Sequence, residues 1–424
     1  MNSDRSLETE SAEGLKNLIF SEKVKKNILA AAITAPSGDN SQPWQFRWTG
    51  ENLFILLDLS KLKALLSEDL SGAFLSLGAV IENIKIAASV YSLDISWEFQ
   101  TENPGAPGAV VRFLPLARPA SSAVVLAPLF ARQTNRHPFK KAPLPAGILQ
   151  ALKSCADPFQ KKVRLRLVSA PGLRKQTALL CQKSEAMGFA NQRMHREFHA
   201  KIIYGKAAQS APSGLAVHTL GLSFLEVAAM RLFRPWSRMN FFIRRFGLHH
   251  LMAFKITRFV ADGPALGAIL IEGNEAGTLI EAGRLMQGLW ITAAKLGLGF
   301  QPSMTFQYLR THAASGSPDL SASARRAVAD CDRQFQKLWG LQEDERLAFF
   351  FRVGFPTKIT PKSLRRPMEE FLEEESRNFV PGGSSDAGER PAARFSVFRF
   401  IFEKMTGPLK KRAAFYQSVM TTEF

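Results

Sequence analysis

Apolar and polar positions alternate with two different periods along the chain, and together they predict a mixture of helices and short strands. Apolar residues at helical spacing follow Ser21, a residue type favoured at helix N-termini, and predict a helix over 21–32. Two strand-like runs, 44–48 and 53–57, are joined by a turn at 49–52 and predict a β-hairpin. Further strands are expected at 95–99, 110–114, 163–170, 268–272 and 347–355, and further helices at 173–204 and 321–339. The pattern therefore predicts an α+β fold.

Two further helices, at 75–93 and 281–298, are so apolar that we expect them to be buried over most of their surface. When Gly283 is aligned with Gly78, apolar residues fall on apolar residues along both segments. The matched pairs are Leu285 with Val80, Met286 with Ile81, Leu289 with Ile84, Ile291 with Ile86, Ala293 with Ala88 and Leu298 with Leu93. The alignment indicates a weak internal repeat, although helices built for burial resemble one another in any case.

The length and composition of the chain limit the architectures that it can adopt. The chain has 424 residues, 46% of them apolar, which suggests two domains or one large duplicated domain. Its three cysteines are too few and too scattered for a disulfide framework or a cysteine zinc site. No apolar run reaches the roughly 18 residues that a membrane span needs, and the polar, acidic N-terminus is unlike a secretory signal. We expect a cytoplasmic protein.

The charge balance is strongly basic and points to anionic partners. Lys and Arg number 55 against 37 Asp and Glu, which gives a formal net charge of +18. Phosphorylated cofactors, acidic proteins, phospholipid surfaces and nucleic acid would all be attracted by this charge. The sequence carries no nucleic-acid-binding motif that we could identify, so nucleic acid is not an expected partner.

Basic and aromatic residues concentrate in the segment 223–260. Between Arg231 and Arg258 there are seven Lys or Arg residues and no acid, with phenylalanines and a tryptophan among them. Such a segment can lie on an anionic membrane surface, form a lid over a hydrophobic substrate channel, or form packed helices whose arginines reach solvent. The tail at 394–424 has a similar pattern, so both segments are candidates for peripheral membrane contact.

Residues 35–44, with the sequence APSGDNSQPW, form the first candidate for a binding element. Two prolines, a glycine and a polar cluster enforce a fixed, non-helical path between the helix and the hairpin. Ser37, Asn40 and Gln42 then offer donors and acceptors that could meet the edge of a flat heteroaromatic ring. The alternative is a simple turn that ends the helix and leads into the strand.

Residues 132–139, with the sequence RQTNRHPF, form the second candidate. Arg132 and Arg136 are four residues apart with the hydroxyl of Thr134 between them, so all three could converge on one phosphate. The alternative is an exposed basic start of a helix.

A pair of histidines was weighed as a metal site. His195 and His199 are spaced to share a helix face, but Glu197 stands in the wrong place for a zinc-protease motif. Because the sequence offers no convincing third ligand, a solvated or core-edge helix face is the favoured interpretation and no metal is expected.

Four segments resemble elements of the nitroreductase flavoprotein family. Residues 35–44 resemble its Ala-Pro-Ser-x-x-Asn-x-Gln-Pro-Trp signature, and 132–136 resemble its Arg-x-Ser/Thr-x-Arg motif. Residues 282–303 look like the helix and loop that pass beside the flavin ring. Residues 354–367, from Gly-Phe-Pro to Arg-Arg-Pro, resemble the family's C-terminal tail. The resemblance covers roughly residues 22–370, in pieces.

This resemblance implies an FMN-dependent oxidoreductase that passes two electrons through the flavin N5 to or from a small organic substrate. No dinucleotide fingerprint is present, so NAD(P)H would bind transiently as the reductant. The implied cofactor-binding residues are Pro36, Ser37, Asn40, Gln42, Arg132, Thr134, Arg136, Gly299, Gln301, Ser303 and one of Arg365 and Arg366, and no catalytic residue is assigned. Two alternatives remain open: a protein that stores FMN beneath a lid, and a membrane-associated interaction protein with a vestigial fold.

The order of the motifs departs from that of ordinary family members, in which the phosphate motif lies close to the N-terminus. Here it follows the Pro-Ser loop by about 95 residues. The order resembles that of the single-chain, Acg-type branch, in which two tandem half-domains form an intrachain pseudo-dimer with one FMN. It implies two halves, each a small mixed or antiparallel sheet packed with helices, and a chain functional as a monomer. The expected parts are 1–120, 121–375 with a lid-like insertion at about 190–260, and a linker with a basic C-terminal helix at 376–424.

Overall fold

The computed structural model describes residues 21–62, 70–100, 107–116, 120, 122–159 and 162–373. These residues belong to one compact unit, Met1–Arg377. The extreme N-terminus and the expected linker and basic helix at 376–424 lie outside the described residues.

The first sheet is formed early in the chain, after helix α2 (Glu22–Ala32). Its strands are β1 (Trp44–Thr49), β2 (Asn52–Leu57), β3 (Leu93–Gln100) and β4 (Gly108–Pro115). They lie in the order β1-β2-β4-β3, and each neighbouring pair is antiparallel. The predicted hairpin is confirmed, with Gly50 at its tip in the left-handed region (φ +60°).

The second sheet is formed by β5 (Val163–Val168), β8 (Ala265–Glu272), β9 (Gly299–Pro302) and β10 (Glu345–Gly354). Its order is β5-β8-β10-β9, again with each neighbouring pair antiparallel. The two sheets therefore share one arrangement: counted along the chain, the first, second, fourth and third strands lie side by side. The loop implied at the end of the 282–303 segment is wrong from Gly299 to Pro302, because these residues pair with the end of β10 as an edge strand.

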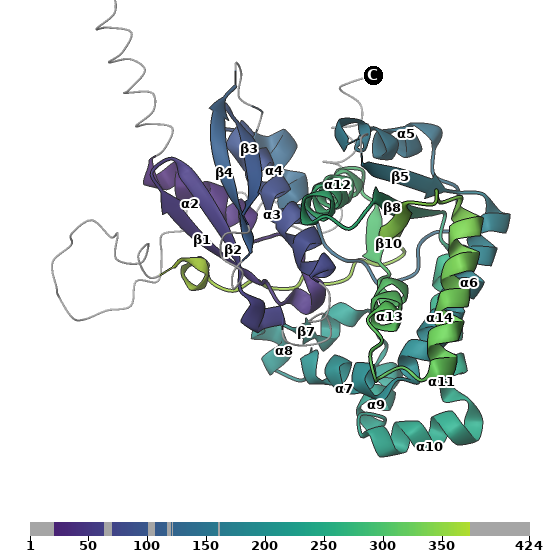
Figure 1. Cartoon of the computed structure of the whole chain (residues 1–424). Coiled ribbons are helices and arrows are strands. Elements are labelled where there is room, and N and C mark those ends of the chain that lie inside the picture. The colour runs from purple at the N-terminus through teal and green to yellow at the C-terminus, as the bar shows by residue number, and fades with distance from the viewer. Residues whose placement is uncertain are drawn as a thin grey trace, which may run out of the picture. The chain divides into compact units, whose positions relative to one another are not determined.

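Two helices cross between the sheets, α3 (Ser71–Ser89) and α12 (Ala276–Lys295) (Figure 1). A Cβ atom added to Gly78 would lie 2.0 Å from the backbone oxygen of Ile280, and one added to Gly283 would lie 2.2 Å from that of Leu75. The contacts are reciprocal, since Leu75 precedes Gly78 by the same three residues by which Ile280 precedes Gly283. The two glycines aligned in the sequence repeat thus permit the closest approach of the two helices.

Helix α3 qualifies one expectation drawn from the sequence. Among the described residues it alone is long and apolar enough to cross a membrane, although no run of that length was recognised in the sequence. In this structure 67% of the tested window is buried inside the protein, as in the core helix of a globular domain. Together with α12 it forms the centre of the larger hydrophobic core.

Several helices surround the second sheet: α4 (Ser122–Ala131), α5 (Ala146–Ser154), α6 (Pro171–Phe189), α13 (Thr305–Ala314) and α14 (Ala322–Trp339). A smaller core joins this sheet to α6 and α14. The single helix expected at 173–204 is interrupted at Asn191, whose side chain accepts a hydrogen bond from the backbone of Met194 and so caps a new helix, α7 (Gln192–Lys201).

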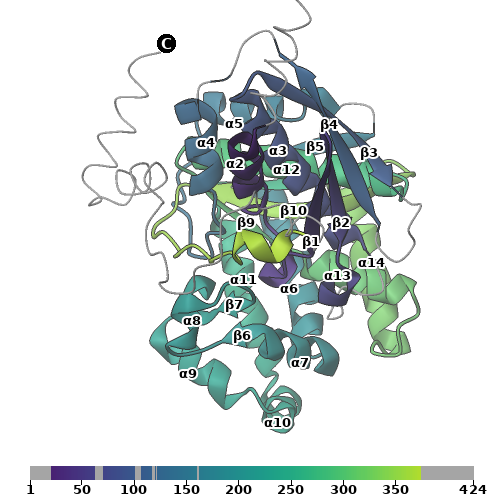
Figure 2. The ribbon, with the colours of Figure 1, turned by 90° about the vertical axis from the view of Figure 1, so that its left-hand side faces the viewer.

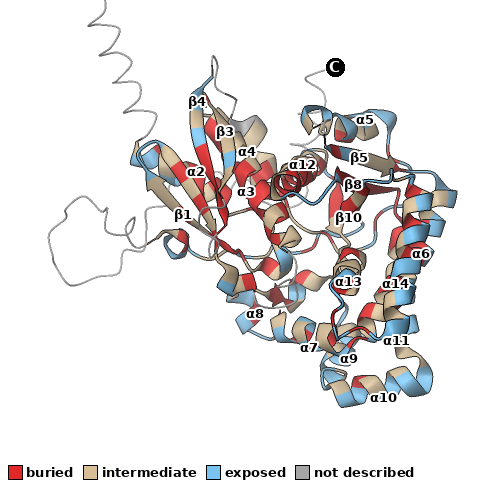
Figure 3. Ribbon diagram, in the orientation of Figure 1, coloured by how far each residue is buried: buried red, intermediate tan, exposed pale blue. Residues whose placement is uncertain are grey.

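The insertion expected at about 190–260 is a run of short elements. After α7 come β6 (Ile202–Ile203), α8 (Ala207–Ser210) and β7 (Leu215–Ala216), and then α9 (Phe224–Leu232), α10 (Trp236–Phe246) and α11 (Leu248–Asp262). Figures 1 and 2 both show α7 to α10 at the same end of this unit. Figure 3 shows that α9 and α10 carry almost no buried positions, whereas α3 and α12 are largely buried.

Candidate functional site

The loop between α2 and β1 has an unusual backbone. Asp39, Asn40 and Gln42 have φ values of 51°, 56° and 51°, in the left-handed region that residues with a Cβ atom seldom adopt. The hydroxyl oxygen of Ser37 accepts a hydrogen bond of 2.8 Å from the backbone nitrogen of Gln42 and closes the loop. Backbone strain concentrated in this way is typical of binding and catalytic elements, because the surrounding structure must hold it.

The two side-chain amides of this loop are bonded to distant parts of the chain. Asn40 donates to the carbonyl oxygens of Leu364 (3.1 Å) and Pro212 (3.3 Å). Gln42 also donates to Pro212 (2.8 Å), and its side-chain oxygen accepts from the backbone nitrogen of Arg366 (3.0 Å). The polar atoms that the sequence assigns to a ring edge thus hold the insertion and the C-terminal tail against the loop, and their contact with a ligand stays a prediction.

Two arginines from different motifs converge on the backbone just after the end of α2. Arg132 donates from Nη2 to the carbonyl oxygen of Thr34 at 2.9 Å. Arg365 donates from Nη2 to the oxygens of Thr34 and Ala35, both at 3.1 Å, and from Nη1 to the side-chain oxygen of Asn40 at 2.9 Å. These are charge-assisted hydrogen bonds, in which a guanidinium donates to neutral backbone oxygens. The structure thereby brings together the Pro-Ser loop, the Arg132 motif and the tail.

Arg136 lies against the same loop. Its Nη1 donates to the carbonyl oxygen of Thr219 (2.8 Å), and its backbone nitrogen donates to the hydroxyl of Thr360 (3.1 Å). Burial raises the pKa of Asp39, and the nearby charges of Lys201 and Arg136 oppose that rise. Arg136 and the Asp39 to Gln42 segment are therefore close in space, beneath the insertion.

Arg132, Arg365 and Lys362 form a cluster of cations that no acid of the described residues pairs with. Arg132 is only 3% exposed, and the Nε atoms of Arg132 and Arg365 are buried without a hydrogen-bond partner. Within the part of the chain that the structure describes, none of the three forms a salt bridge. Burial, followed by the charge of Arg365, holds the pKa of Arg132 well below its usual value, and burial lowers that of Arg365 to about 10. Uncompensated buried charge is costly, so the cluster suits an anionic ligand.

Lys362 stands at the solvent side of this cluster. The residue is exposed, but its ammonium group donates to the carbonyl oxygen of Phe130 and faces the two arginines. Burial of that group, and then the charges of Arg132 and Arg365, lower the pKa of Lys362 to about 7. A bound anion would favour the charged form of the lysine and raise its pKa again.

This pKa predicts a pH dependence for phosphate binding. Without ligand, Lys362 loses its proton as the pH rises through about 7, so from pH 7 to 9 an anion must bind together with a proton. We expect the affinity for a phosphorylated ligand to fall as the pH rises over this window. Calorimetric titration in two buffers of different ionisation enthalpy should show proton uptake on binding at pH 8.

The matched variant for this test is Lys362→Met, which keeps the aliphatic stem and removes the titrating group. It should bind the ligand more weakly at pH 7, with no proton uptake and a flat profile between pH 7 and 9. Unchanged proton uptake in Lys362→Met would show that another group titrates.

The strand β9 lies next to the Arg132 motif, but only part of it approaches the candidate site. The backbone oxygen of Phe300 accepts from the backbone nitrogen of Asn135 (2.9 Å), and a Cβ atom on Gly299 would meet the ring of Phe139 at 2.6 Å. The side-chain oxygen of Gln301 accepts from Nε of Arg352 (2.7 Å) and is thus engaged inside the protein.

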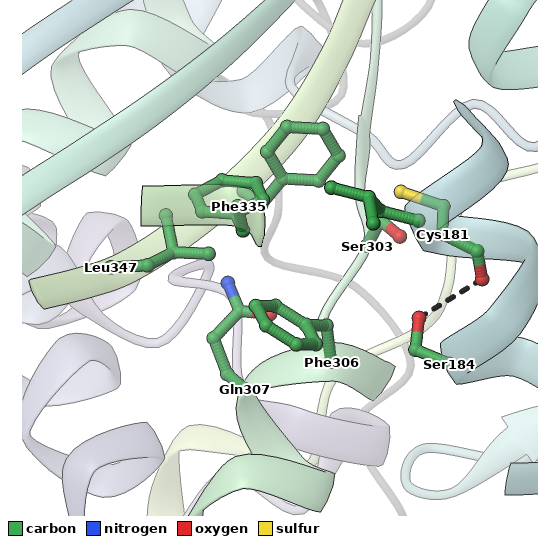
Figure 4. Close-up of a pocket in the computed structure, with 9 residues that line it drawn as sticks. Cys181, Ser184, Ser303, Phe306, Gln307, Phe335 and Leu347 are labelled. Carbon is green, nitrogen blue, oxygen red and sulfur yellow. Dashed lines mark hydrogen bonds between the residues drawn. The ribbon is translucent and has the colours of Figure 1, made fainter. Parts of the chain in front are cut away.

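Ser303 lies elsewhere. It lines a small pocket between α6, α13 and the second sheet, together with Cys181, Ser184, Phe306 and Gln307 (Figure 4). The lining of this pocket includes none of the cationic cluster, so the structure does not bring Ser303 together with the other predicted site residues.

Three contributors to the site were not identified in the sequence. Lys362 precedes the Arg365 pair by three residues, and the density of basic residues there was the available signal. Trp290 packs its ring against the guanidinium of Arg132, 4.6 Å from its Cζ, and donates to the backbone oxygen of Gln133. Pro212 contributes only a carbonyl oxygen, which no sequence pattern reports.

The two helix-spaced histidines lie side by side, with ring centroids 4.4 Å apart. Nε2 of His195 lies 3.0 Å from the carbonyl oxygen of Arg234, and burial lowers the pKa of His199 to about 4. Among the described residues no group of three or more metal-ligating side chains is found, here or elsewhere.

The chain is similar in sequence to known proteins, although the identities are low. No family model matches the chain. An uncharacterized protein, MT1398 of Mycobacterium tuberculosis, is 24% identical over 352 residues, which is 81% of this chain and 48% of that protein. A putative NAD(P)H nitroreductase, acg, from the same species is 24% identical over 284 residues, 65% of this chain and 78% of that protein. The chain spans about half the length of the first relative. In sequence, it is similar to a nitroreductase.

Solved structures were also compared. The FMN-dependent nitroreductase NfnB from Mycobacterium smegmatis, in complex with NADPH, is 13% identical and matches 59% of this chain and 96% of its own, with a TM-score of 0.33. An iodotyrosine deiodinase bound to FMN and 3-iodo-L-tyrosine is 17% identical, with coverages of 57% and 95% and a TM-score of 0.32.

Proposed function

We propose that the protein is an FMN-dependent oxidoreductase of the nitroreductase type. The observation that carries the proposal is the cluster of Arg132, Arg365 and Lys362, which has no acidic partner among the described residues and leaves the buried Nε donors of the two arginines unpaired. A phosphate monoester supplies the negative charge and the acceptor oxygens that these groups lack. The cluster adjoins the strained loop at 39–42. The cluster would therefore bind the phosphate of FMN, and the neighbouring loop would bind the edge of its ring.

Of the two arginines in the C-terminal tail, we propose that Arg365 binds the phosphate of FMN. Its neighbour Arg366 donates to the backbone oxygen of Gln42 (2.6 Å), lies 3.7 Å from Glu370 and packs on the ring of Phe371. Arg366 therefore already has an acidic partner and a structural role, whereas no acid or aromatic ring among the described residues pairs with Arg365. Thr134 stands between Arg132 and Arg136 and is the hydroxyl donor that we expect on the same phosphate.

Bound FMN would supply two-electron transfer at its N5 between a reduced nicotinamide and a small organic acceptor. The residues described here would bind and orient it: the cationic cluster holds the phosphate, and the loop at 35–44 fixes the ring. The carbonyl contacts of Pro212 and Thr219 hold residues 202–221 over that loop and over Arg136. We therefore propose this part of the insertion as the cover that limits access of water and substrate.

We further propose that the fold is nitroreductase-like and consists of two tandem halves, 1–120 and 121–375, that form one intrachain pseudo-dimer. The common strand order of the two sheets and the reciprocal contacts of Gly78 and Gly283 support it, because a two-fold relation produces such paired contacts. The Pro-Ser loop belongs to the first half and the phosphate cluster to the second, so one complete site results.

Reduction of the purified protein by NADPH tests this function. We expect the protein to be isolated yellow, or to take up added FMN, and mass spectrometry of the material released on heating to identify FMN. Anaerobic mixing with NADPH should then bleach the flavin absorbance.

Two negative results of this experiment are possible, and they have different meanings. Bound FMN that NADPH and NADH both leave oxidised would indicate storage rather than turnover. A colourless protein that takes up no FMN would contradict the proposal as a whole.

A further inference from the structure

The three helices α9, α10 and α11 expose large apolar side chains to an extent unusual for a globular protein. No residue of α9 is buried, and Met239 alone is buried in α10. The exposed apolar residues are Phe224 (84%), Leu225 (76%), Leu232 (53%), Phe241 (59%), Phe242 (36%), Phe246 (64%), Leu251 (69%) and Phe254 (51%). We call this set the α9–α11 surface. A concentration of this kind marks an interaction site, because isolated exposed apolar residues are normal but clusters are not.

Part of this surface is one continuous aromatic cluster. The ring centroids of Phe233 and Phe242 lie 5.1 Å apart, those of Phe241 and Phe242 5.4 Å, and those of Phe242 and Phe246 5.5 Å. The cluster joins the end of α9 to α10, the helix at the far end of the insertion in Figure 1. Aromatic side chains in such a position are suited to the boundary between lipid head groups and acyl chains.

The same helices carry only positive charge from Arg231 to Arg258. The cations are Arg231, Arg234, Arg238, Arg244, Arg245, Lys255 and Arg258. The acid that precedes this run, Glu226, pairs with Lys255 across α9 and α11 and accepts the capping hydrogen bonds of Ser223, and the acid that follows it, Asp262, pairs with Lys141. Arg238, Arg244 and Arg245 are exposed, and none forms a salt bridge within the part of the chain that is described.

We propose that the α9–α11 surface docks on an anionic phospholipid membrane. Insertion of the phenylalanines and leucines removes apolar area from water, and the arginines that accompany them face lipid phosphates. A second copy of the chain would be a poorer occupant, because it would present the same cations and repel the first. The proposal is independent of the flavin chemistry.

Vesicle flotation with the full-length protein tests the proposal. We expect the protein to float with vesicles that contain phosphatidylglycerol, at least tenfold more than with phosphatidylcholine alone, and to be released by high salt. Two double variants address the two components of the surface: Phe241→Ser with Phe246→Ser, and Arg244→Gln with Arg245→Gln. Each should lower the binding about tenfold or more, because the first removes apolar area that enters the lipid and the second removes two cations that face lipid phosphates.

The matched control removes an exposed apolar side chain and a cation elsewhere. Leu179→Ser with Arg333→Gln changes residues of α6 and α14 that are also exposed, and should bind as the wild type does. Circular dichroism and thermal melting should be alike for all variants, since the changed side chains are on the surface.

Three results would overturn the proposal. The first is the absence of flotation with anionic vesicles. The second is flotation that survives both double variants, which would place the contact elsewhere in the chain. The third is a concentration-dependent dimer that the Phe variants abolish while vesicles bind neither form, which would make a second copy the occupant.

Discussion

FMN is expected to bind about 100-fold more weakly when Arg365 is replaced by methionine, whereas riboflavin, which lacks the phosphate, should lose at most about threefold. The reason is the position of the guanidinium: it lies in a cluster with Arg132, and among the described residues it has no acidic partner. Charge-assisted hydrogen bonds to a phosphate contribute about 1.5–3 kcal/mol each, which is about 10- to 150-fold in affinity. Fluorescence quenching of both flavins during titration of the apoprotein measures the difference.

The adjacent arginine supplies the control for this prediction. Arg366→Met should change FMN affinity by less than about fivefold, because Arg366 is already paired with Glu370 and stacked on Phe371. It should lower the melting temperature instead, through lost contacts with Gln42. Equal losses for riboflavin and FMN in Arg365→Met would mean that the arginine shapes the loop rather than binding phosphate.

Gly283→Ala is expected to destabilise the protein by about 3 kcal/mol or more, the upper range for overpacking in a core. The added methyl group would sit 2.2 Å from the backbone oxygen of Leu75, so α3 and α12 would have to move apart. Gly78→Ala should have a similar effect, because its contact with Ile280 is the reciprocal one. Urea unfolding followed by circular dichroism gives the free energies.

Gly288 offers a control within the same helix. A Cβ atom there meets nothing within 4 Å, so Gly288→Ala should be neutral or stabilise the protein by about 0.4–1 kcal/mol through lower entropy of the unfolded chain. If Gly283→Ala were as stable as Gly288→Ala, the close crossing of α3 and α12 described above would be incorrect.

Local sequence patterns correctly predicted the helices and strands that are determined by interactions between residues close together in the sequence. The hairpin of β1 and β2 follows from alternation and a glycine turn, and α14 begins after Ser321 as expected, with the serine hydroxyl accepting from Ala324. The segment from Gly299 to Pro302 was misassigned, since glycine and proline favour a loop locally but pairing with β10 decides its structure. Proline and alanine at 116–126 likewise favour a connector by composition, but α4 begins within this segment at Ser122.

The candidate site could likewise be predicted from the sequence only in part. Arg132 and Arg365 could be named from the sequence because their motifs are short and contiguous. Their convergence on the carbonyl oxygen of Thr34 could not, since it depends on the tertiary path of a chain that separates them by more than 200 residues. The role of Pro212 could not be predicted for a different reason: it contributes a backbone oxygen, which every residue type has. Ser303 looked suitable by its neighbours in sequence, but it lies in another pocket.

The crossing of α3 and α12 also has a consequence for synthesis on the ribosome. The first sheet and α3 are complete once β4 has been made, yet the helix that covers α3 begins only at Ala276, about 190 residues after α3 ends. At about 5–20 residues per second, the nascent chain would present a bare apolar helix for on the order of 10–40 s. During that interval the growing chain should be a client of ribosome-associated chaperones, and its yield should depend on them more than that of a protein whose core closes locally.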